Sequence, residues 1–354
     1  MNIVNIVKKI LIKEWLFSLS FLGFLLTSVY FFRIPHYSID DFKVLFTLFV
    51  FLILTKGLEK SNFLKYLAIK AERGRFVSLK IVLFTAFISA FITNDVALIV
   101  IVPLTLLMKI PKLELLIVLE AMAANSGSAL SPFGNPQNIF IYYHYNLHFK
   151  EFVETIFPFV FVSLILLILL TPKGKEKIKP MEEEVKYSWE SYLLLFFFGT
   201  FILSVLKFIP LWAGILPVTY AFFFNREILK IDYFLLFTFF FFFGLTDNLV
   251  HTLNLRLENP TEVFLYSAIG SQIMSNVPAT LFFADFTNQW EPLLWGVNVG
   301  GFGNLIGSLA NLLAYKLYVE KVGNSKKIFI KFHVIGYLFF IVGILTFLIT
   351  THLK

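Results

Sequence analysis

The stretch NSGSALSPFGNPQN at residues 125–138 lies between apolar runs that are long enough to sit inside a membrane. Glycine and proline disrupt helices, and Ser and Asn side chains compete for backbone hydrogen bonds. The stretch therefore predicts unwound backbone rather than a continuous helix. In hydrocarbon, unwound backbone persists only where protein or a water-filled cavity surrounds it. We therefore expect a binding site within the membrane at this place.

A second stretch, NVGGFGNLIGSLAN at residues 298–311, aligns with the first without a gap. Asn125 falls on Asn298, Gly127 on Gly300, Gly134 on Gly307 and Asn138 on Asn311. Glycine- or proline-interrupted apolar segments at corresponding places in two halves are typical of secondary transporters, in which they form the substrate site. The alternative is a pair of kinked helices that pack closely through small residues.

Composition indicates an all-α integral membrane protein. Of the 354 residues, 58% are hydrophobic, and the mean hydropathy is +0.80. These values are too apolar for an ordinary soluble domain. Charge-free runs at 15–32, 155–172, 208–225 and 292–315 each approach the ~20 residues that span a bilayer.

The net charge of +7 reflects orientation in a membrane rather than a nucleic-acid partner. Of the 30 Lys and Arg residues, 24 fall on one alternating set of loops, including 56–80, 173–186 and 316–331. Basic loops lie on the cytoplasmic side. We therefore expect a multi-pass protein of the cytoplasmic (inner) membrane, with the N-terminus and its basic arm (residues 1–13) inside and the C-terminus outside. The absence of cysteine excludes disulfides and cysteine-based metal or redox chemistry.

The predicted topology has nine spans and two re-entrant hairpins. The hairpins cover 81–108 and 261–288, and each arm of the first is only ~13 residues, short of a full crossing. The two broken spans cover 113–143 and 291–316. The uninterrupted spans are at about 15–32, 42–58, 151–171, 188–206, 209–224, 231–248 and 328–350.

The order span, span, hairpin, broken span, span occurs twice and begins on opposite sides of the membrane. Residues 1–171 are predicted to form the first inverted repeat and 208–354 the second. Residues 172–207 are a charged cytoplasmic linker followed by a connecting span. Inverted repeats place the substrate and coupling-ion sites near the midplane, between the two halves.

The candidate substrate- and ion-binding residues come from the two hairpin tips and the two unwound stretches. Side-chain oxygens suit a hard cation such as Na⁺, and helix ends offer N–H groups to anions. Na⁺ is assigned to Asn94, Asp95 and Asn276. Each single Asn or Ser could equally form a hydrogen bond between helices. The full set is Thr93, Asn94, Asp95, Asn125, Ser126, Gly127, Ser128, Pro132, Gly134, Asn135, Ser275, Asn276, Val277, Asn298, Gly300, Gly301, Asn304, Gly307 and Ser308.

Asp95 carries the sharpest functional signal of these residues. A charged side chain at the bilayer centre costs roughly 2.5–3.5 kcal/mol on insertion scales. We therefore predict that Asp95 binds the coupling ion, either as a proton acceptor or as a Na⁺ ligand. The alternative is a buried acid that holds the fold together. Glu120 and Asp247 are further relay candidates, although each could instead be paired or interfacial.

Other polar residues are expected to be structural. His144 and His148 have the spacing of helical metal ligands but no acidic partner in a motif, so we expect solvated side chains, with Asp285 at the outer surface. No GxSxG, HExxH or P-loop pattern occurs. The sequence thus argues against an enzyme or an ATP-driven pump, and it predicts no cofactor beyond a coupling Na⁺ or H⁺.

The motifs resemble those of the ion transporter superfamily, which includes arsenite permeases, D-type Na⁺/H⁺ antiporters, citrate transporters and divalent-anion symporters. The run at 131–138 resembles the first unwound segment of that superfamily, and 298–311 resembles the second. Thr93-Asn94-Asp95 resembles the first hairpin tip of the arsenite and antiporter branches, and residues 275–278 resemble the second tip. The divalent-anion symporters carry Ser-Asn-Thr at both tips, which this chain lacks. The resemblance implies an elevator-type transporter with a mobile hairpin domain and a scaffold domain that dimerises.

These observations predict an ion-coupled secondary transporter, nearest to the uncharacterised anion-permease branch. Its substrate would be a small oxyanion, the neutral acid of that oxyanion such as arsenite, or a carboxylate. Neither tip and neither stretch contains Lys or Arg, so an anion would be held by helix ends, amides and a co-bound cation. Two alternatives stay open. One is a Na⁺/H⁺ antiporter that uses Asp95, and the other is a passive channel.

Overall fold

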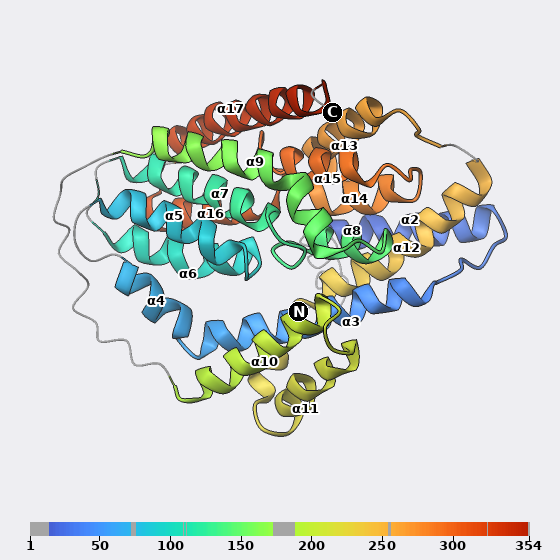
Figure 1. The fold of residues 1–354 in the computed structure, drawn as a ribbon, viewed down its shortest axis with the longest axis horizontal. Coiled ribbons are helices and arrows are strands. Elements are labelled where there is room, and N and C mark those ends of the chain that lie inside the picture. The colour runs from blue at the N-terminus through green and yellow to red at the C-terminus, as the bar shows by residue number, and fades with distance from the viewer. Residues whose placement is uncertain are drawn as a thin grey trace, which may run out of the picture.

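The computed structural model describes residues 14–71, 76–108, 110, 112–172, 188–253, 256–323 and 325–352. Regular structure within these residues is helical throughout, as the composition predicts (Figure 1). The predicted basic arm at 1–13 and nearly all of the charged linker lie outside the described residues. In chain order the helices are α2 (Trp15–Tyr30), α3 (Ile39–Lys60), α4 (Phe63–Ala71), α5 (Val77–Ser89), α6 (Asn94–Leu107), α7 (Leu113–Ala129), α8 (Pro136–His144), α9 (Phe149–Leu170), α10 (Glu190–Val205), the 3-10 helix η1 (Leu211–Gly214), α11 (Ile215–Phe223), the 3-10 helix η2 (Arg226–Leu229), α12 (Tyr233–Leu253), α13 (Pro260–Met274), α14 (Asn276–Ala284), α15 (Trp290–Gly300), α16 (Leu309–Val322) and α17 (Ser325–His352).

Three described helical segments are long and apolar enough to cross a membrane: Phe149–Leu170, Arg226–Thr252 and Lys326–Thr351. Several others are apolar but shorter, so the count of nine spans stays a prediction. The span predicted at 209–224 is divided into η1 and α11. Helix α4 was not predicted, because a basic loop was expected over its residues.

Helical hairpins lie at both places where the sequence predicts them. Helices α5 and α6 pack against each other and are joined by residues 90–93, and α13 and α14 meet at the single residue Ser275. Ser275 has a φ of 75°, an unfavourable backbone conformation for a residue with a Cβ. It lets α13 end and α14 begin with no intervening loop. That the hairpins re-enter one face of a membrane stays a prediction.

Both broken helices are present, but their unwound parts are shorter than predicted. Helix α7 continues through Asn125 to Ala129, and irregular backbone covers only 130–135. In the second half α15 runs to Gly300, and 301–308 are irregular. The prediction of unwound backbone from Asn125 and from Asn298 is therefore wrong for the first residues of each stretch.

The helices form two packing groups. The scaffold group consists of α2, α3, α10, α11 and α12, and the hairpin group consists of α5–α9 and α13–α17. Helix α4 contacts α3 of the first group and α5 and α6 of the second. Figure 1 shows α9 and α17 along one edge of the molecule and α10 and α11 at the opposite edge. The two groups meet where α3 contacts α6 and α8, and where α12 contacts α14.

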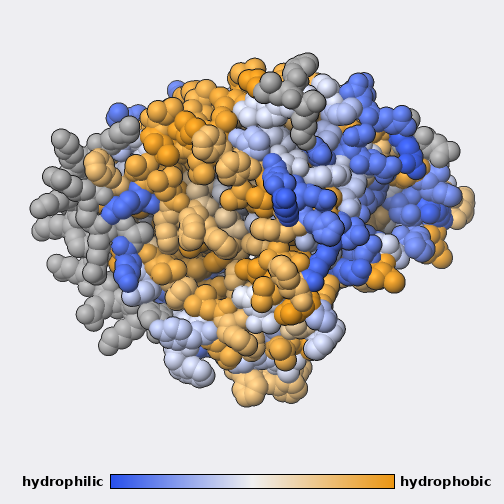
Figure 2. Space-filling model, in the orientation of Figure 1, coloured by the Kyte–Doolittle hydropathy of each residue, from blue (hydrophilic) through white to orange (hydrophobic). Residues whose placement is uncertain are grey.

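The surface is consistent with a membrane protein. Figure 2 shows hydrophobic residues over much of the visible face, with hydrophilic residues gathered toward one end. Exposed large apolar side chains are numerous on α10 and α11, among them Trp189, Tyr192, Phe196 and Phe223. In water such a surface would drive aggregation, whereas lipid or a second chain can cover it.

Candidate functional site

Each hairpin tip is hydrogen-bonded to the unwound segment of its own half. The backbone N–H of Asn94, the first residue of α6, donates to the carbonyl of Gly134 at 3.3 Å. The backbone N–H of Asn276, the first residue of α14, donates to the carbonyl of Gly307 at 3.0 Å. These N–H groups begin helices and have no partner within them. The two glycines are the aligned pair of the sequence analysis, so the contact occurs at corresponding positions.

Asparagine amides connect the two halves. The Asn125 amide donates to Oδ1 of Asn311 at 2.8 Å, and the Asn298 amide donates to Oδ1 of Asn138 at 2.9 Å. Asn125 and Asn298 are an aligned pair, and so are Asn138 and Asn311. The same bond is therefore made twice, once in each direction. We call the five residues Asn94, Asn125, Asn138, Asn298 and Asn311 the asparagine cluster.

Asn138 and Asn311 hold their own unwound segments in shape. The Asn138 amide donates to the carbonyls of Ser128 and Ser131, each at 3.2 Å. The Asn311 amide donates to the aligned carbonyls of Gly301 and Asn304, at 2.9 and 3.2 Å. Buried carbonyls that leave a helix need such donors. Asn138 and Asn311 were not among the predicted site residues, although their alignment was the available signal.

The asparagine cluster also reaches the first hairpin tip. Asn94 donates its side-chain amide to Oδ1 of Asn125 at 3.0 Å. Its own Oδ1 accepts the backbone N–H of Asp95 at 2.9 Å. All five cluster residues are at most 3% exposed. Because buried polar groups are costly without partners, the cluster stabilises one arrangement of tip and broken helices.

The second hairpin is tied to its unwound segment by a residue that the sequence analysis missed. The Gln272 side-chain amide donates to the carbonyls of Gly300 and Phe302 at 2.6 and 3.0 Å. Its Oε1 accepts the backbone N–H of Asn304 at 3.0 Å. The side-chain amide of Asn304 returns a bond to the Gln272 carbonyl at 2.9 Å. In the first half, Ser131 and Ala90 occupy the positions of Asn304 and Gln272, and the Ser131 hydroxyl donates a hydrogen bond to the Ala90 carbonyl at 2.5 Å.

The predicted glycines bring backbones together rather than line an open space. A Cβ at Gly127 would lie 1.9 Å from the carbonyl oxygen of Ala86 on α5, and a Cβ at Gly300 would lie 2.5 Å from Cβ of Ser271 on α13. At Gly134 a Cβ would lie 2.3 Å from the Ser128 carbonyl oxygen. Each hairpin therefore packs on the broken helix of its own half at distances that a larger residue would not allow.

The remaining predicted residues of the two stretches have local structural contacts. Ser126 and Ser128 donate to carbonyls of their own helix, those of Met122 and Asn125, so both hydroxyls have partners within α7. The Asn135 amide donates to the Ser128 hydroxyl at 2.7 Å. Ser308 caps α16 by accepting the backbone N–H of Ala310. Pro132, Ser275 and Val277 are buried, and their side chains form no hydrogen bond to a distant part of the described chain. Gly301 is buried, and its carbonyl accepts the side-chain amides of Asn125 and Asn311 at 3.3 and 2.9 Å.

Thr93 and Asp95 face a cavity of about 340 Å³ between the two packing groups. Leu52 and Thr55 of α3 and Asp232 just before α12 line its scaffold side, and the start of α8 lines the hairpin side. Asp95 Oδ1 is buried and has no hydrogen-bond partner among the described residues. Asp95 is thus the member of the predicted set that presents a charge to open space.

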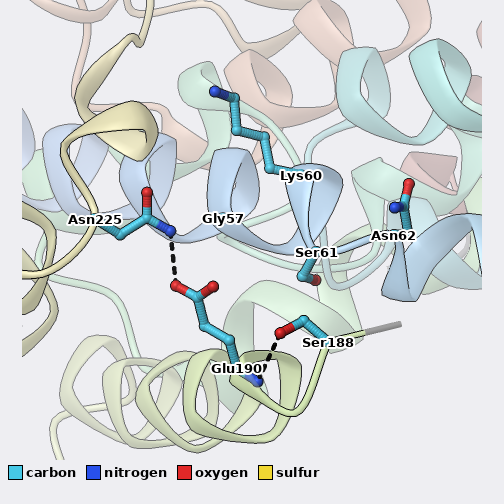
Figure 3. Close-up of a pocket in the computed structure, with 7 residues that line it drawn as sticks. All are labelled: Gly57, Lys60, Ser61, Asn62, Ser188, Glu190 and Asn225. Atoms are coloured by element: carbon cyan, nitrogen blue, oxygen red, sulfur yellow. Dashed lines mark hydrogen bonds between the residues drawn. The ribbon is translucent and has the colours of Figure 1, made fainter. Parts of the chain in front are cut away.

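Two other cavities contain none of the predicted site residues. One of about 330 Å³ lies within the scaffold group, where the Asn225 amide donates to the Glu190 carboxylate at 2.6 Å (Figure 3). The other, of about 1100 Å³, lies between α9, α15 and α17 and includes Trp290 and Trp295. Neither touches the hairpin tips.

Several expectations for the ionisable residues change. His144 does have an acidic neighbour, since its Nε2 lies 3.8 Å from Oδ1 of Asp285. Asp285 is only partly exposed, at 26% of its side chain. Asp247 is paired, with Arg33 at 2.9 Å, which favours the structural alternative over a relay. Among the described residues no group of three or more His, Asp or Glu side chains is placed to hold a metal ion.

An apolar, all-helical chain in which two helical hairpins meet two broken helices has the architecture of a membrane transporter. The chain belongs to the citrate transporter family, whose sequence profile matches residues 10–297. The family indicates a transporter rather than an enzyme, and it indicates no cofactor.

Individual relatives agree with this assignment. An uncharacterised transporter of Methanocaldococcus jannaschii is 34% identical over 295 residues, which are 79% of this chain and 82% of the relative. The inner membrane protein YbiR of Escherichia coli is 34% identical over 325 residues, 83% of each chain. A silicon efflux transporter of Oryza sativa is 29% identical over 150 residues, 40% of this chain and 31% of the relative.

Proposed function

We propose that the protein is an ion-coupled secondary transporter of a small anion or of its neutral acid. The observation that carries this proposal is the asparagine cluster, which joins two hairpin-bound broken helices by the same hydrogen bond in both directions. Such an arrangement supports two inverted repeats (residues 1–171 and 208–354) with one site between them. Secondary transporters bind substrate at this kind of junction of broken helices.

The substrate class follows from the donors that surround the site. Amides and helix N-termini donate hydrogen bonds to oxyacids and carboxylates, and neither tip nor either unwound segment supplies a Lys or Arg. Small hydroxylated acids that are neutral at physiological pH, such as arsenite or silicic acid, fit this donor set. The similarity to a rice protein named as a silicon efflux transporter supports an oxyacid as the substrate. Membership of the citrate transporter family supports a carboxylate as the substrate.

Coupling would come from a cation at Asp95, with Asn94 and Asn276 as neighbouring ligands. Asp95 lines a cavity and carries an unpartnered carboxylate oxygen. A carboxylate at membrane depth is unfavourable unless a proton or cation neutralises it. Binding of that cation would then compensate for the charge of an anionic substrate.

Alternating access would be of the elevator type, with the hairpin group moving against the scaffold group. The close packing at Gly127 and Gly300 supports the movement of each hairpin together with its broken helix. The apolar surface of α10 and α11 would be covered by lipid or by the second chain of a homodimer. We place the protein in the cytoplasmic membrane with the N-terminus inside and the C-terminus outside, from the distribution of Lys and Arg.

A Na⁺/H⁺ antiporter is the second candidate, favoured by the lack of cationic side chains at the tips. The two candidates are separated in proteoliposomes that contain a trapped pH indicator and no oxyacid or carboxylate. Under an inward Na⁺ gradient, an antiporter makes the lumen alkaline, and Asp95→Asn abolishes the signal. A substrate transporter leaves the lumen unchanged and instead accumulates radiolabelled arsenite or dicarboxylate. Uncoupled current far above transporter turnover would contradict both and indicate a channel.

A further inference from the structure

The cavity at the first hairpin tip is built from both packing groups. Thr93 and Asp95 belong to the hairpin group, whereas Thr55 and Asp232 come from the scaffold group. Asp232 lies immediately before α12, and its Oδ1 accepts the backbone N–H of Leu235 at 3.2 Å. Asp232 therefore has a fixed position at the start of a scaffold helix, far from Asp95 in sequence.

The charges around this cavity are unequally compensated. Lys56 and Glu59, which both line it, form an ion pair at 3.0 Å. Lys230 also lines it and pairs with Glu227, outside the cavity lining, at 2.7 Å. Asp95 and Asp232 form no ion pair with any described residue. Two carboxylates from opposite packing groups thus line one cavity, and neither has a Lys or Arg of the described chain within ion-pair distance. Lys230 lines the same cavity, and its partner Glu227 also pairs with Lys60.

Asp95 is partly buried and Asp232 is exposed at the mouth of the cavity. Two carboxylates that line one cavity repel each other, and a bound cation reduces that repulsion. Lys56, Glu59 and Lys230, which also line the cavity, are held in ion pairs. The other polar side chains of the lining offer oxygens, namely the carboxylates of Asp95 and Asp232 and the hydroxyls of Thr55 and Thr93. The Thr55 hydroxyl donates a hydrogen bond to the Phe51 carbonyl at 2.7 Å, so the lone pairs of its oxygen are available to bind a cation. Hard cations prefer oxygen ligands of this kind.

We propose that Asp232 is the second carboxylate of the coupling-cation site and that a hard monovalent cation binds between it and Asp95 in this conformation. This inference rests on the proposed role of Asp95. It adds that the site is shared between the moving and the static group, so it is complete only when the hairpin tip lies against the start of α12. Cation binding then stabilises this conformation, and the departure of the hairpin group separates the two carboxylates.

Na⁺ binding to the purified full-length protein tests the proposal without a transport assay. The midpoint of thermal unfolding is measured against NaCl, with choline chloride keeping the ionic strength constant. Asp232→Asn removes the charge but keeps the side-chain oxygen that caps α12. Glu59→Gln is the matched control, because Glu59 lines the same cavity but is already paired with Lys56.

We expect the Na⁺ concentration for the half-maximal shift to rise about fivefold or more in Asp232→Asn and to stay within about twofold of wild type in Glu59→Gln. Asp95→Asn should lose the Na⁺-dependent shift, and Asp232→Glu should restore most of the affinity. If Asp232→Asn matches Glu59→Gln while Asp95→Asn loses the response, the inference is overturned and the proposed role of Asp95 stands. If wild type and Asp95→Asn respond alike, or if wild type shows no response, the shared cation site and the role of Asp95 as a Na⁺ ligand are both overturned.

Discussion

The two hairpin tips share one hydrogen-bond pattern and differ in one charge. In each half, the first N–H of the second hairpin arm bonds to an aligned glycine carbonyl, Gly134 or Gly307. In the first half the next residue is Asp95, which faces a cavity, and in the second half it is Val277, which is buried. The common pattern positions both tips, and only the first tip presents an ionisable side chain. The hydrogen-bond frame therefore belongs to both halves, whereas an ionisable side chain at the tip itself belongs to the first half alone.

The largest effect is expected from removing that charge. Asp95→Asn should reduce cation-driven substrate uptake by about 5–150-fold, the range that typical coupling free energies of 1–3 kcal/mol correspond to. This reduction is measured as the uptake of substrate into proteoliposomes with and without a cation gradient. Val277→Thr, at the matching position of the second tip, should leave the cation dependence unchanged. Equal losses in both variants would mean that the tips contribute shape and not charge.

A second large effect is expected where the hairpins pack on the broken helices. Gly127→Ala should destabilise the protein by about 3 kcal/mol, because the new Cβ would meet the backbone of Ala86, which has little freedom to move. Gly300→Ala should also destabilise, because its Cβ would lie 2.5 Å from Cβ of Ser271 and 2.9 Å from the Ala268 carbonyl oxygen. The cost should be smaller than at Gly127, because these distances are longer than the 1.9 Å to the Ala86 carbonyl oxygen. Thermal unfolding of the purified variants provides the comparison.

Gly199→Ala on α10 is the control, since no atom lies within 4 Å of its added Cβ. It should be neutral or stabilising by up to about 1 kcal/mol. A Gly127→Ala protein as stable as Gly199→Ala would contradict the rigid packing of the first hairpin.

Much of this architecture could be predicted from the chain alone. Hydropathy and the gap-free alignment of 125–138 with 298–311 located both hairpins and both broken helices. The extent of unwinding could not be predicted, because Ser126 and Ser128 bond back to their own helix and Gly127 allows close packing on α5. Propensity counts Ser and Gly as poor helix formers, whereas the close packing of Gly127 on Ala86 is a tertiary contact that favours a continuous helix here.

Asp232 and Gln272 are two residues whose contacts could not be predicted from the sequence. Asp232 lies before an ordinary apolar helix, and nothing in its local sequence relates it to Asp95, 137 positions earlier. The sequence places Gln272 near the second hairpin turn, but its three side-chain hydrogen bonds depend on the backbone conformation of residues 300–304. Pairings of this kind arise from tertiary structure and leave no periodic pattern.

The asparagine cluster predicts a smaller, unequal effect in the two halves. Asn125→Ala removes the partner of both Asn94 and Asn311, whereas Asn298→Ala removes a single cluster bond, to Asn138. Buried groups left without partners cost about 1–3 kcal/mol each. We therefore expect Asn125→Ala to be the more destabilising of the two, by about 1–2 kcal/mol in thermal or denaturant unfolding. Equal destabilisation would show that the Asn94 bond contributes nothing.

The smallest effect is expected from the extra anchor of the second hairpin. Gln272→Ala removes side-chain bonds to Gly300, Phe302 and Asn304, while the first hairpin, with Ala90 at the corresponding place, never had them. Because Gln272 is only partly buried, water can replace some of these bonds, and the loss should be about 1 kcal/mol. Hydrogen exchange should therefore rise at 300–307 and stay unchanged at 130–135, with the exposed Asn288→Ala as the control. Faster exchange in both segments would mean that the asparagine cluster transmits the change between the halves, so that the two tips are one cooperative unit.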